Sequence, residues 1–449
     1  MTFFKHGILL LAFAVKPSFA NLLDLESVTS QIEDVNQTIS ERVSDIKTEK
    51  IKPITNQTHI KVDNLASEII NLELITPVTE LAKKMDVRDR QGNLLYQDVE
   101  VENGWRAIAQ QWLAWFTLAE LRQFNRAVAE LNIHIQAQES FPSLGLNLVK
   151  FQVPASYDSY QKLSKTLPSH LMNKIDRNHV YTAQNAETTA SSTQENLNQN
   201  RQVCDDRIKL GMVDTAINTK HLALAQSQII QQSFLAENIQ TPQAHGTAVA
   251  ALLVSSSPVI PALTPNAQLY SAAVFHPQGK YAQGAALINL IKGLDWLIQQ
   301  DVKVINMSLA GPDNSVLAQA VKLAHSQQVT IVAAVGNQGP SAPPMYPAAY
   351  PQVIAVTAVD KQAGIYRWAN RGEYVDFAAV GVAVKTARGE GEFGAESGTS
   401  IATPVVTAYV ACEKLAQRNS NFYQTLIQKV TDLGPPGKDS IYGYGLLSQ

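Results

Sequence analysis

Apolar residues recur at regular spacings along the first part of the chain. Seven of them follow one another every three or four positions, namely Leu25, Val28, Ile32, Val35, Ile39, Val43 and Ile46. This period predicts an amphipathic helix, which Pro53 and Pro77 interrupt. Two interpretations stay open, a surface helix packed on its own domain and a short dimerising coiled coil. Residues 21–90 are therefore expected to form a helical N-terminal region.

Residues 91–183 show a mixed pattern that predicts a small α+β domain. Trp105–Leu131 is rich in Ala, Gln and Leu and is expected to be a helix. Ile133–Ile135 and Leu144–Val153 are strand candidates, and Ser159–Leu167 is a second, shorter helix candidate.

Residues 184–204 change character sharply, because Gln, Asn, Ser, Thr and Glu dominate and almost nothing is left to bury. Such a segment cannot offset the entropy that ordering would cost, so we expect a flexible linker. Proteases cut linkers of this kind, and a maturation cleavage between Tyr181 and Val203 is therefore expected.

Between residues 205 and 449, short apolar runs alternate with helical patterns. The strand candidates are Leu210–Val213, Leu269–Val274, Val302–Met307, Thr330–Val335 and Val353–Val356, and the helix candidates are His245–Val254, Ala282–Gln300 and Ser315–Ser326. This alternation predicts an α/β domain with a mostly parallel sheet and helices on both faces. Asp214 and Asn337 then follow the carboxyl ends of strands, the edge at which such sheets gather their ligands.

Residues 1–20 have the pattern of a secretory signal peptide. Lys5 and His6 precede the apolar run Gly7–Val15, and Ser18–Ala20 offers small residues for cleavage after Ala20. The run is too short for an ordinary transmembrane helix, and no other stretch is free enough of charge to span a bilayer. We therefore expect an exported protein, secreted or periplasmic, with no integral membrane span after cleavage. An uncleaved N-terminal anchor is the alternative.

Charge and cysteine content narrow the possible partners and bonds. The formal net charge is −3 and the chain has no basic tract, so no nucleic-acid partner is expected. The two cysteines, Cys204 and Cys412, permit one disulfide in an oxidising compartment. Two separate thiols are the alternative, because sequence does not supply the geometry that a disulfide needs.

Candidate chemistry centres on Ser400, which follows a flexible Gly-Thr pair and begins an apolar run. A nucleophilic serine needs a base within hydrogen-bond reach and a third group that orients this base. His245 opens an apolar helical run, and Asp214 ends the apolar run Gly211–Val213. Asp214, His245 and Ser400 are therefore a candidate catalytic triad.

Five separated motifs resemble the subtilisin-like serine proteases, the subtilases. They are the Gly-Thr-Ser-x-Ala-x-Pro segment that contains Ser400, Ala333–Pro340, Val304–Leu309, Tyr346–Pro351 and Ile441–Leu446. They occur in the order of the family and cover roughly residues 207–447. The resemblance implies a subtilisin-like fold and a serine endopeptidase that acts on polypeptide substrates.

The resemblance also assigns further residues to the site. It implies that Asn337 is the side-chain donor of the oxyanion hole. It implies a strand that pairs with the substrate backbone at Ser308, Leu309, Ala310 and Gly311, and one wall of the specificity pocket at Ala334, Val335 and Gly336.

Residues 91–183 are similar, through diffuse motifs, to the inhibitory propeptides of the family. Such a propeptide assists folding and occupies the active site with its C-terminal end. An ordinary accessory domain is the alternative.

The chain departs from the family where alanine replaces glycine. Ala216, Ala251 and Ala310 each add a methyl group where backbone or substrate approaches closely, and Met345 falls near the expected floor of the specificity pocket. We expect a narrowed pocket that prefers small or modest side chains before the scissile bond. The loop at residues 255–261 has no carboxylates, so no calcium is expected there. Calcium elsewhere stays open, and catalysis requires no cofactor.

The favoured function is a secreted serine endopeptidase, made as a self-processing zymogen whose own N-terminal domain is the inhibitor. Two alternatives stay open. One is a non-catalytic subtilase scaffold used for binding at the cell envelope, and the other is a processing protease of narrow specificity.

Overall fold

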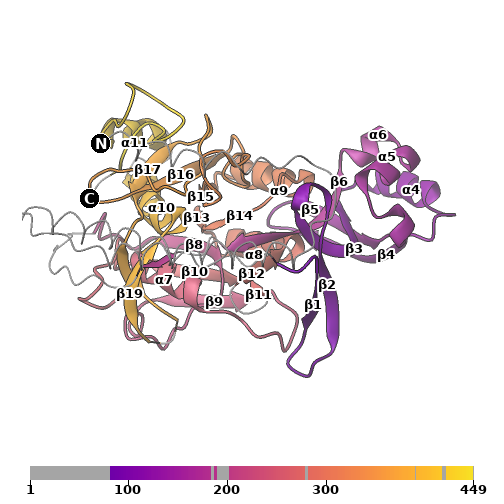
Figure 1. Ribbon diagram of the computed structural model, residues 1–449, viewed down its shortest axis with the longest axis horizontal. Helices are drawn as coiled ribbons and strands as arrows, with labels where there is room; N and C mark the ends of the chain where they lie inside the picture. Colours follow the sequence, from indigo (N-terminus) through magenta and orange to yellow (C-terminus); the bar gives the residue numbers. More distant parts are fainter. Residues whose placement is uncertain are drawn as a thin grey trace, which may run out of the picture. The chain divides into compact units, whose positions relative to one another are not determined.

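The computed structural model describes residues 81–183, 187–189, 202–278, 282–389, 391–416 and 421–447. The expected signal peptide and the helical apolar stripe lie outside these ranges. Residues 81–449 form one compact unit, in which we distinguish an α+β part, residues 81–183, and an α/β part, residues 202–447 (Figure 1). No described helix has both the length and the apolar character needed to cross a membrane.

A sheet of seven strands, paired in parallel throughout, forms the centre of the α/β part. Its order is β17-β16-β15-β13-β8-β10-β9. The strands are β8 Lys209–Asp214, β9 Ile229–Ser233, β10 Gln268–Ala273, β13 Val304–Met307, β15 Thr330–Ala334, β16 Val353–Val359 and β17 Phe377–Val380. The predicted parallel sheet is therefore confirmed.

Helices cover both faces of this sheet (Figure 1). One hydrophobic cluster contains α8 (Leu287–Gln299) and α9 (Ser315–Ser326). The other contains α7 (Ala244–Val254), α10 (Thr399–Ala416) and α11 (Phe422–Lys429). Asn314 begins α9, because its side chain accepts hydrogen bonds from two amides of the first turn.

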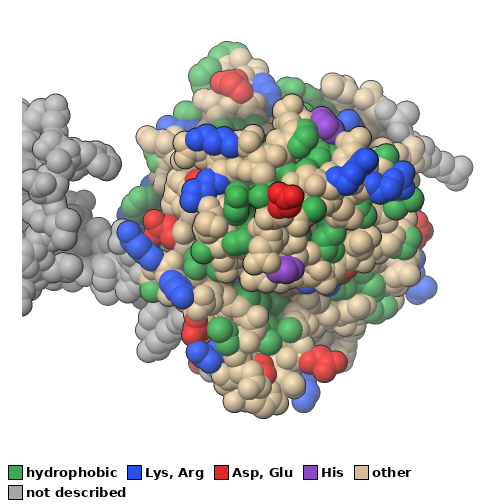
Figure 2. Space-filling model, turned by 90° about the vertical axis from the view of Figure 1, so that its right-hand side faces the viewer, with side chains coloured by type: hydrophobic (Ala, Val, Ile, Leu, Met, Phe, Trp, Pro, Cys, Tyr) green, Lys and Arg blue, Asp and Glu red, His purple; other side chains and the backbone are tan. Residues whose placement is uncertain are grey.

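The α+β part has a hydrophobic core of its own, built around Trp112, Phe124, Phe151 and Leu163. Its elements are β1 Lys84–Arg88, β2 Leu94–Glu100, β3 Arg106–Ala114, α4 Leu118–Ala127, β4 His134–Phe141, β5 Leu146–Gln152, α5 Tyr160–Thr166, α6 Ser169–Met172 and β6 Ile175–Ala183. On the face of this part seen in Figure 2, acidic and basic side chains of the described residues are interspersed.

A second sheet joins the two parts. Strands β1, β2, β3 and β6 continue into β12 (Ala282–Ala286) and β11 (His276–Gln278), in the order β1-β2-β3-β6-β12-β11. Outside this order, β6 also pairs with β14 (Leu309–Ala310). The last strand of the α+β part is thus antiparallel to two strands of the α/β part.

A third sheet contains β18 (Val384–Ala387), β19 (Phe393–Ser397) and β7 (Glu187–Thr189). Strand β7 lies within residues 184–204, so the prediction of a flexible linker is wrong for these three residues. Its polar sequence carries no strand period. It forms a strand because it pairs with the edge of β19, which precedes Ser400.

Three predicted helices also need correction. The helical region expected to extend to residue 90 is wrong at β1, where Met85 and Val87 alternate with exposed residues and pair with β2. The helix expected at Trp105–Leu131 begins only at Leu118, because residues 106–114 form β3. This strand lies between β2 and β6, and buried side chains on both of its faces hide the alternation. The helix expected from Ala282 begins at Leu287, after β12.

Candidate active site

Asp214 and His245 form a buried hydrogen-bonded pair at the carboxyl end of β8. Asp214 is the last residue of β8, and His245 is the second residue of α7. His245 Nδ1 lies 2.7 Å from Asp214 Oδ1, which also accepts the amide of Thr215 at 2.7 Å. Because a carboxylate only accepts, Nδ1 carries the proton, and Nε2 of the neutral ring is the basic nitrogen.

The helix that carries Ser400 packs against the one that carries His245. Ser400 is the second residue of α10, which contacts α7. The backbone of Ser400 is held by Ser308, whose Oγ donates to the Ser400 carbonyl at 3.0 Å. Asn306 Nδ2 donates to Ser308 Oγ at 2.9 Å, and Asn306 Oδ1 accepts from the hydroxyl of Thr407 in α10 at 3.0 Å. This buried network fixes the start of α10 against β13.

Asn337 lies beside Ser400, just after the end of β15. Its Oδ1 accepts hydrogen bonds from the amide of Thr399 at 3.0 Å and from the Thr399 hydroxyl at 2.8 Å. These two donors determine which side of the amide faces Thr399, so that Nδ2 is on the opposite side. This orientation is the one that an oxyanion donor next to Ser400 requires.

The segment expected to pair with a substrate does pair with a strand, and that strand is β6. Ala310 is opposite Thr182 and Leu309 is opposite Ala183 in an antiparallel register. On its other edge β6 pairs with β12. Gly311 is next to the ring of Tyr181, and a Cβ there would overlap this ring. Leu309 and Ala310 thus form the strand β14 (Leu309–Ala310), and Ser308 and Gly311 flank it.

The predicted wall of the specificity pocket, Ala334, Val335 and Gly336, is buried and leads directly into Asn337. The Val335 amide donates to the Val356 carbonyl of β16 at 3.1 Å. These residues therefore lie at the same edge of the sheet as Asp214. Ala216, Ala251 and Met345 are buried as well. The narrowing of the pocket stays a prediction.

Sequence reasoning missed a charged pair close to this site. Glu396, four residues before Ser400, is 8% exposed and accepts from Arg388 Nε at 2.9 Å. Burial raises the pKa of Glu396, against the opposite effects of Arg388 and His245. The signal in the sequence was a glutamate two residues before the Gly-Thr-Ser motif. Asn306 was also missed, although a lone polar residue inside the apolar strand β13 was visible.

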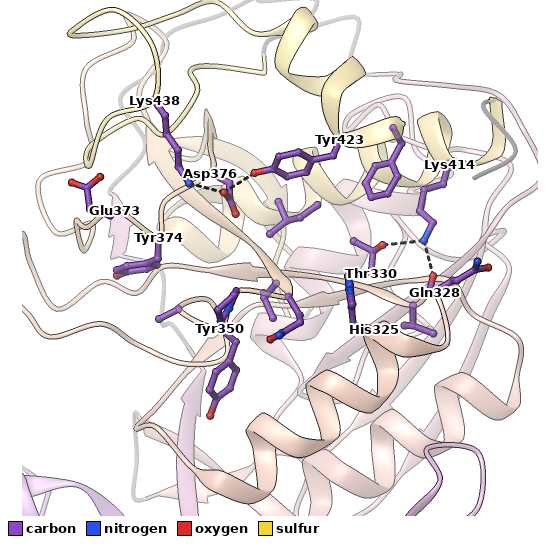
Figure 3. Close-up of a pocket in the computed structure, with 17 residues that line it drawn as sticks. His325, Gln328, Thr330, Tyr350, Glu373, Tyr374, Asp376, Lys414, Tyr423 and Lys438 are labelled. Atoms are coloured by element: carbon purple, nitrogen blue, oxygen red, sulfur yellow. Dashed lines mark hydrogen bonds and ion pairs between the residues drawn. The ribbon is translucent and has the colours of Figure 1, made fainter. Parts of the chain in front are cut away.

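A cavity of about 830 Å³ lies at the other edge of the parallel sheet, at the amino ends of β15 and β16 (Figure 3). Asp376 lines this cavity together with Tyr423 and Lys438. It accepts hydrogen bonds from Tyr423 Oη at 2.7 Å, from Lys438 Nζ at 3.0 Å and from the amide of Ala355 at 2.9 Å. No residue of the candidate active site lines this cavity, so the two are separate.

Comparisons with known proteins agree with this geometry. The chain is 31% identical to the minor extracellular protease Epr of Bacillus subtilis, over 54% of this chain and 37% of the relative. It is 33% identical to subtilisin DY of Bacillus licheniformis, over 54% of this chain and 89% of the relative. It spans 64% of subtilisin amylosacchariticus of Bacillus subtilis subsp. amylosacchariticus.

A solved structure shares the fold. Fervidolysin from Fervidobacterium pennivorans, described as a keratinolytic enzyme related to subtilisin, has a TM-score of 0.60 to this chain. The two are 19% identical, and the match covers 78% of this chain and 61% of fervidolysin. Residues 205–445 match the subtilase family itself. The chain therefore belongs to the subtilase family.

Proposed function

We propose that the chain is an exported serine endopeptidase, with Asp214, His245 and Ser400 as its catalytic triad and its α+β part as an inhibitory propeptide. The observation that carries this proposal is the course of β6. It lies along β12 and β14 as an added strand and runs toward Ser308, which contacts Ser400. Proteases of this kind bind extended polypeptide by the same backbone pairing.

In the proposed mechanism, Ser400 Oγ attacks the scissile carbonyl carbon while His245 Nε2 takes the hydroxyl proton. Asp214 holds the His245 ring through Nδ1 and stabilises the imidazolium that forms. Asn337 Nδ2 donates to the oxyanion of the tetrahedral intermediate. His245 then protonates the leaving amine, and water hydrolyses the acyl-enzyme with His245 again as the base.

The β6 register also supports a specific first cleavage. Thr182 is opposite Ala310 and Ala183 is opposite Leu309. A substrate strand that continued this register by one residue would bring its next peptide bond to Ser308 and Ser400. In this chain the next residue is Gln184, which lies outside the described residues. The proposed processing site is therefore the Gln184–Asn185 bond.

Intact mass spectrometry of the full chain after its predicted signal peptide tests the proposal. We expect wild type to lose an N-terminal fragment that ends at Gln184, and Ser400→Ala to stay full length. A fragment that ends elsewhere would overturn the register argument alone. If neither protein is cut or hydrolyses unfolded protein, even after a trace of another protease has removed the α+β part, the non-catalytic scaffold becomes the better interpretation.

A further inference from the structure

We propose that the β1–β2 hairpin is a second anchor by which the α+β part binds the α/β part, at a surface around His276 and Gln278 of β11, a strand that does not itself pair with β6. The inference rests on the proposed function, since it concerns how long a cleaved propeptide stays bound. It adds an interaction surface that the catalytic mechanism does not use.

Three contacts join the hairpin to the α/β part. Tyr96 Oη lies 3.2 Å from His276 Nδ1, and the two rings meet edge to face at 5.5 Å between centroids. Gln278 Nε2 donates to Asp98 Oδ2. Beside the turn of the hairpin, the Arg90 amide donates to the carbonyl of Asn238 at 2.9 Å.

The hydrogen bond between Gln278 and Asp98 is buried. Asp98 and His276 are fully buried, and Gln278 is 2% exposed. Asp98 is paired with Arg106 of its own part, whose Nε donates at 2.8 Å. The other carboxylate oxygen receives its donor from Gln278, across the interface. A buried carboxylate that loses one donor is destabilised, so this pairing favours the docked arrangement.

The strand order distinguishes this anchor from the pairing of β6 with β12 and β14. Strands β1 and β11 stand at opposite ends of the order β1-β2-β3-β6-β12-β11, yet they contact each other. The sheet therefore curls round, and the α+β part holds the β11–β12 hairpin from two sides. Two linked contacts release far more slowly than either alone, because each keeps the other at a high effective concentration.

The experiment measures release without any need for catalysis. The full chain carries Ser400→Ala, a C-terminal tag and a recognition sequence for a site-specific protease inserted between residues 195 and 196. After cutting and immobilisation through the tag, the rate at which the N-terminal fragment leaves is followed by mass or fluorescence. We expect Gln278→Ala to speed release about ten-fold and Tyr96→Phe about three-fold. Gln97→Ala is the matched control, since its side chain bonds Asp86 within the hairpin.

An unchanged release rate in Gln278→Ala would overturn the second anchor, as would an equal effect of Gln97→Ala. Tyr96→Phe removes one hydroxyl only and keeps the test valid if Gln278→Ala folds poorly, which thermal unfolding reports. In an otherwise wild-type chain, Gln278→Ala should leave the rate of the Gln184–Asn185 cut unchanged and shorten the lag before activity appears. Absence of that cut would contradict the proposed function, while the release rates of the Ser400→Ala proteins would still decide the anchor.

Discussion

The disulfide between Cys204 and Cys412 spans 208 residues and ties the beginning of the α/β part to α10, the helix that carries Ser400. Its main effect is to lower the conformational entropy of the unfolded chain. For a loop of this length, the loop-closure relation gives a loss of about 5 kcal/mol in the free energy of unfolding at 25 °C when the bond is removed. The segment is also held by the Val203 amide, which donates to Leu263 at 2.8 Å, so the native fold should persist.

We therefore expect Cys204→Ser with Cys412→Ala to unfold at a lower urea concentration, with a loss of about 2 to 5 kcal/mol. Alanine is chosen at position 412 because that side chain is buried, and a hydroxyl there would add a cost of its own. Both proteins carry Ser400→Ala to prevent autolysis, and tryptophan fluorescence reports unfolding.

The control is the parent protein with both cysteines, measured in the presence of a reductant that breaks the disulfide. Its free energy of unfolding should match that of the double variant. A loss below about 1 kcal/mol in both would refute the loop-entropy reasoning. A large loss in the variant but not in the reduced parent would instead point to the substitutions themselves.

Three further predictions follow from buried contacts. Gly311→Ala should speed release of the N-terminal fragment about ten-fold, because a Cβ there overlaps the ring of Tyr181. The release assay with the tagged protein measures this, and an unchanged rate would contradict it. Asp376→Ala removes the acceptor of three hydrogen bonds beside the cavity and should lower the free energy of unfolding by about 3 kcal/mol, measured in urea. Burial raises the pKa of Asp176 to about 6 and lowers that of His179 to about 3, from ordinary values of 3.8 and 6.5. Both groups contact the α/β part, since Asp176 accepts from the Ser315 amide and His179 lies beside the side chain of Asn314. Protonation thus favours the docked state through Asp176 and the released state through His179, so release should vary little between pH 6 and 4. Asp176→Asn should leave only the effect of His179, and release should then accelerate toward acid by up to about ten-fold per pH unit, whereas a flat profile would contradict the assignment.

The parts of this chain that sequence predicted well are those in which local pattern and tertiary role agree. The parallel strands carry continuous apolar runs because both faces are buried. The motif residue Asp214 ends β8, and Asn337 comes soon after β15, which ends at Ala334. Strand β3 shows the limit of this reasoning. It pairs with β2, β5 and β6 and is covered on both faces, so its composition matches a buried helix equally well. Strand β7 forms only because it pairs with β19.

The contacts between the two parts were beyond prediction for a different reason. Asp98 and Gln278 are polar residues of types that usually face solvent, and they are 180 positions apart. Their burial follows from the curling of a sheet that crosses from one part to the other.

This shared sheet also has a consequence for the proposed function. Under the proposed function, a substrate and β6 would compete for the same edges of β12 and β14, so cutting the chain would not by itself free these edges. Activity would appear only as fast as β6 leaves, and that rate would depend on the β1–β2 hairpin, whose contacts with the α/β part lie at His276, Gln278 and Asn238.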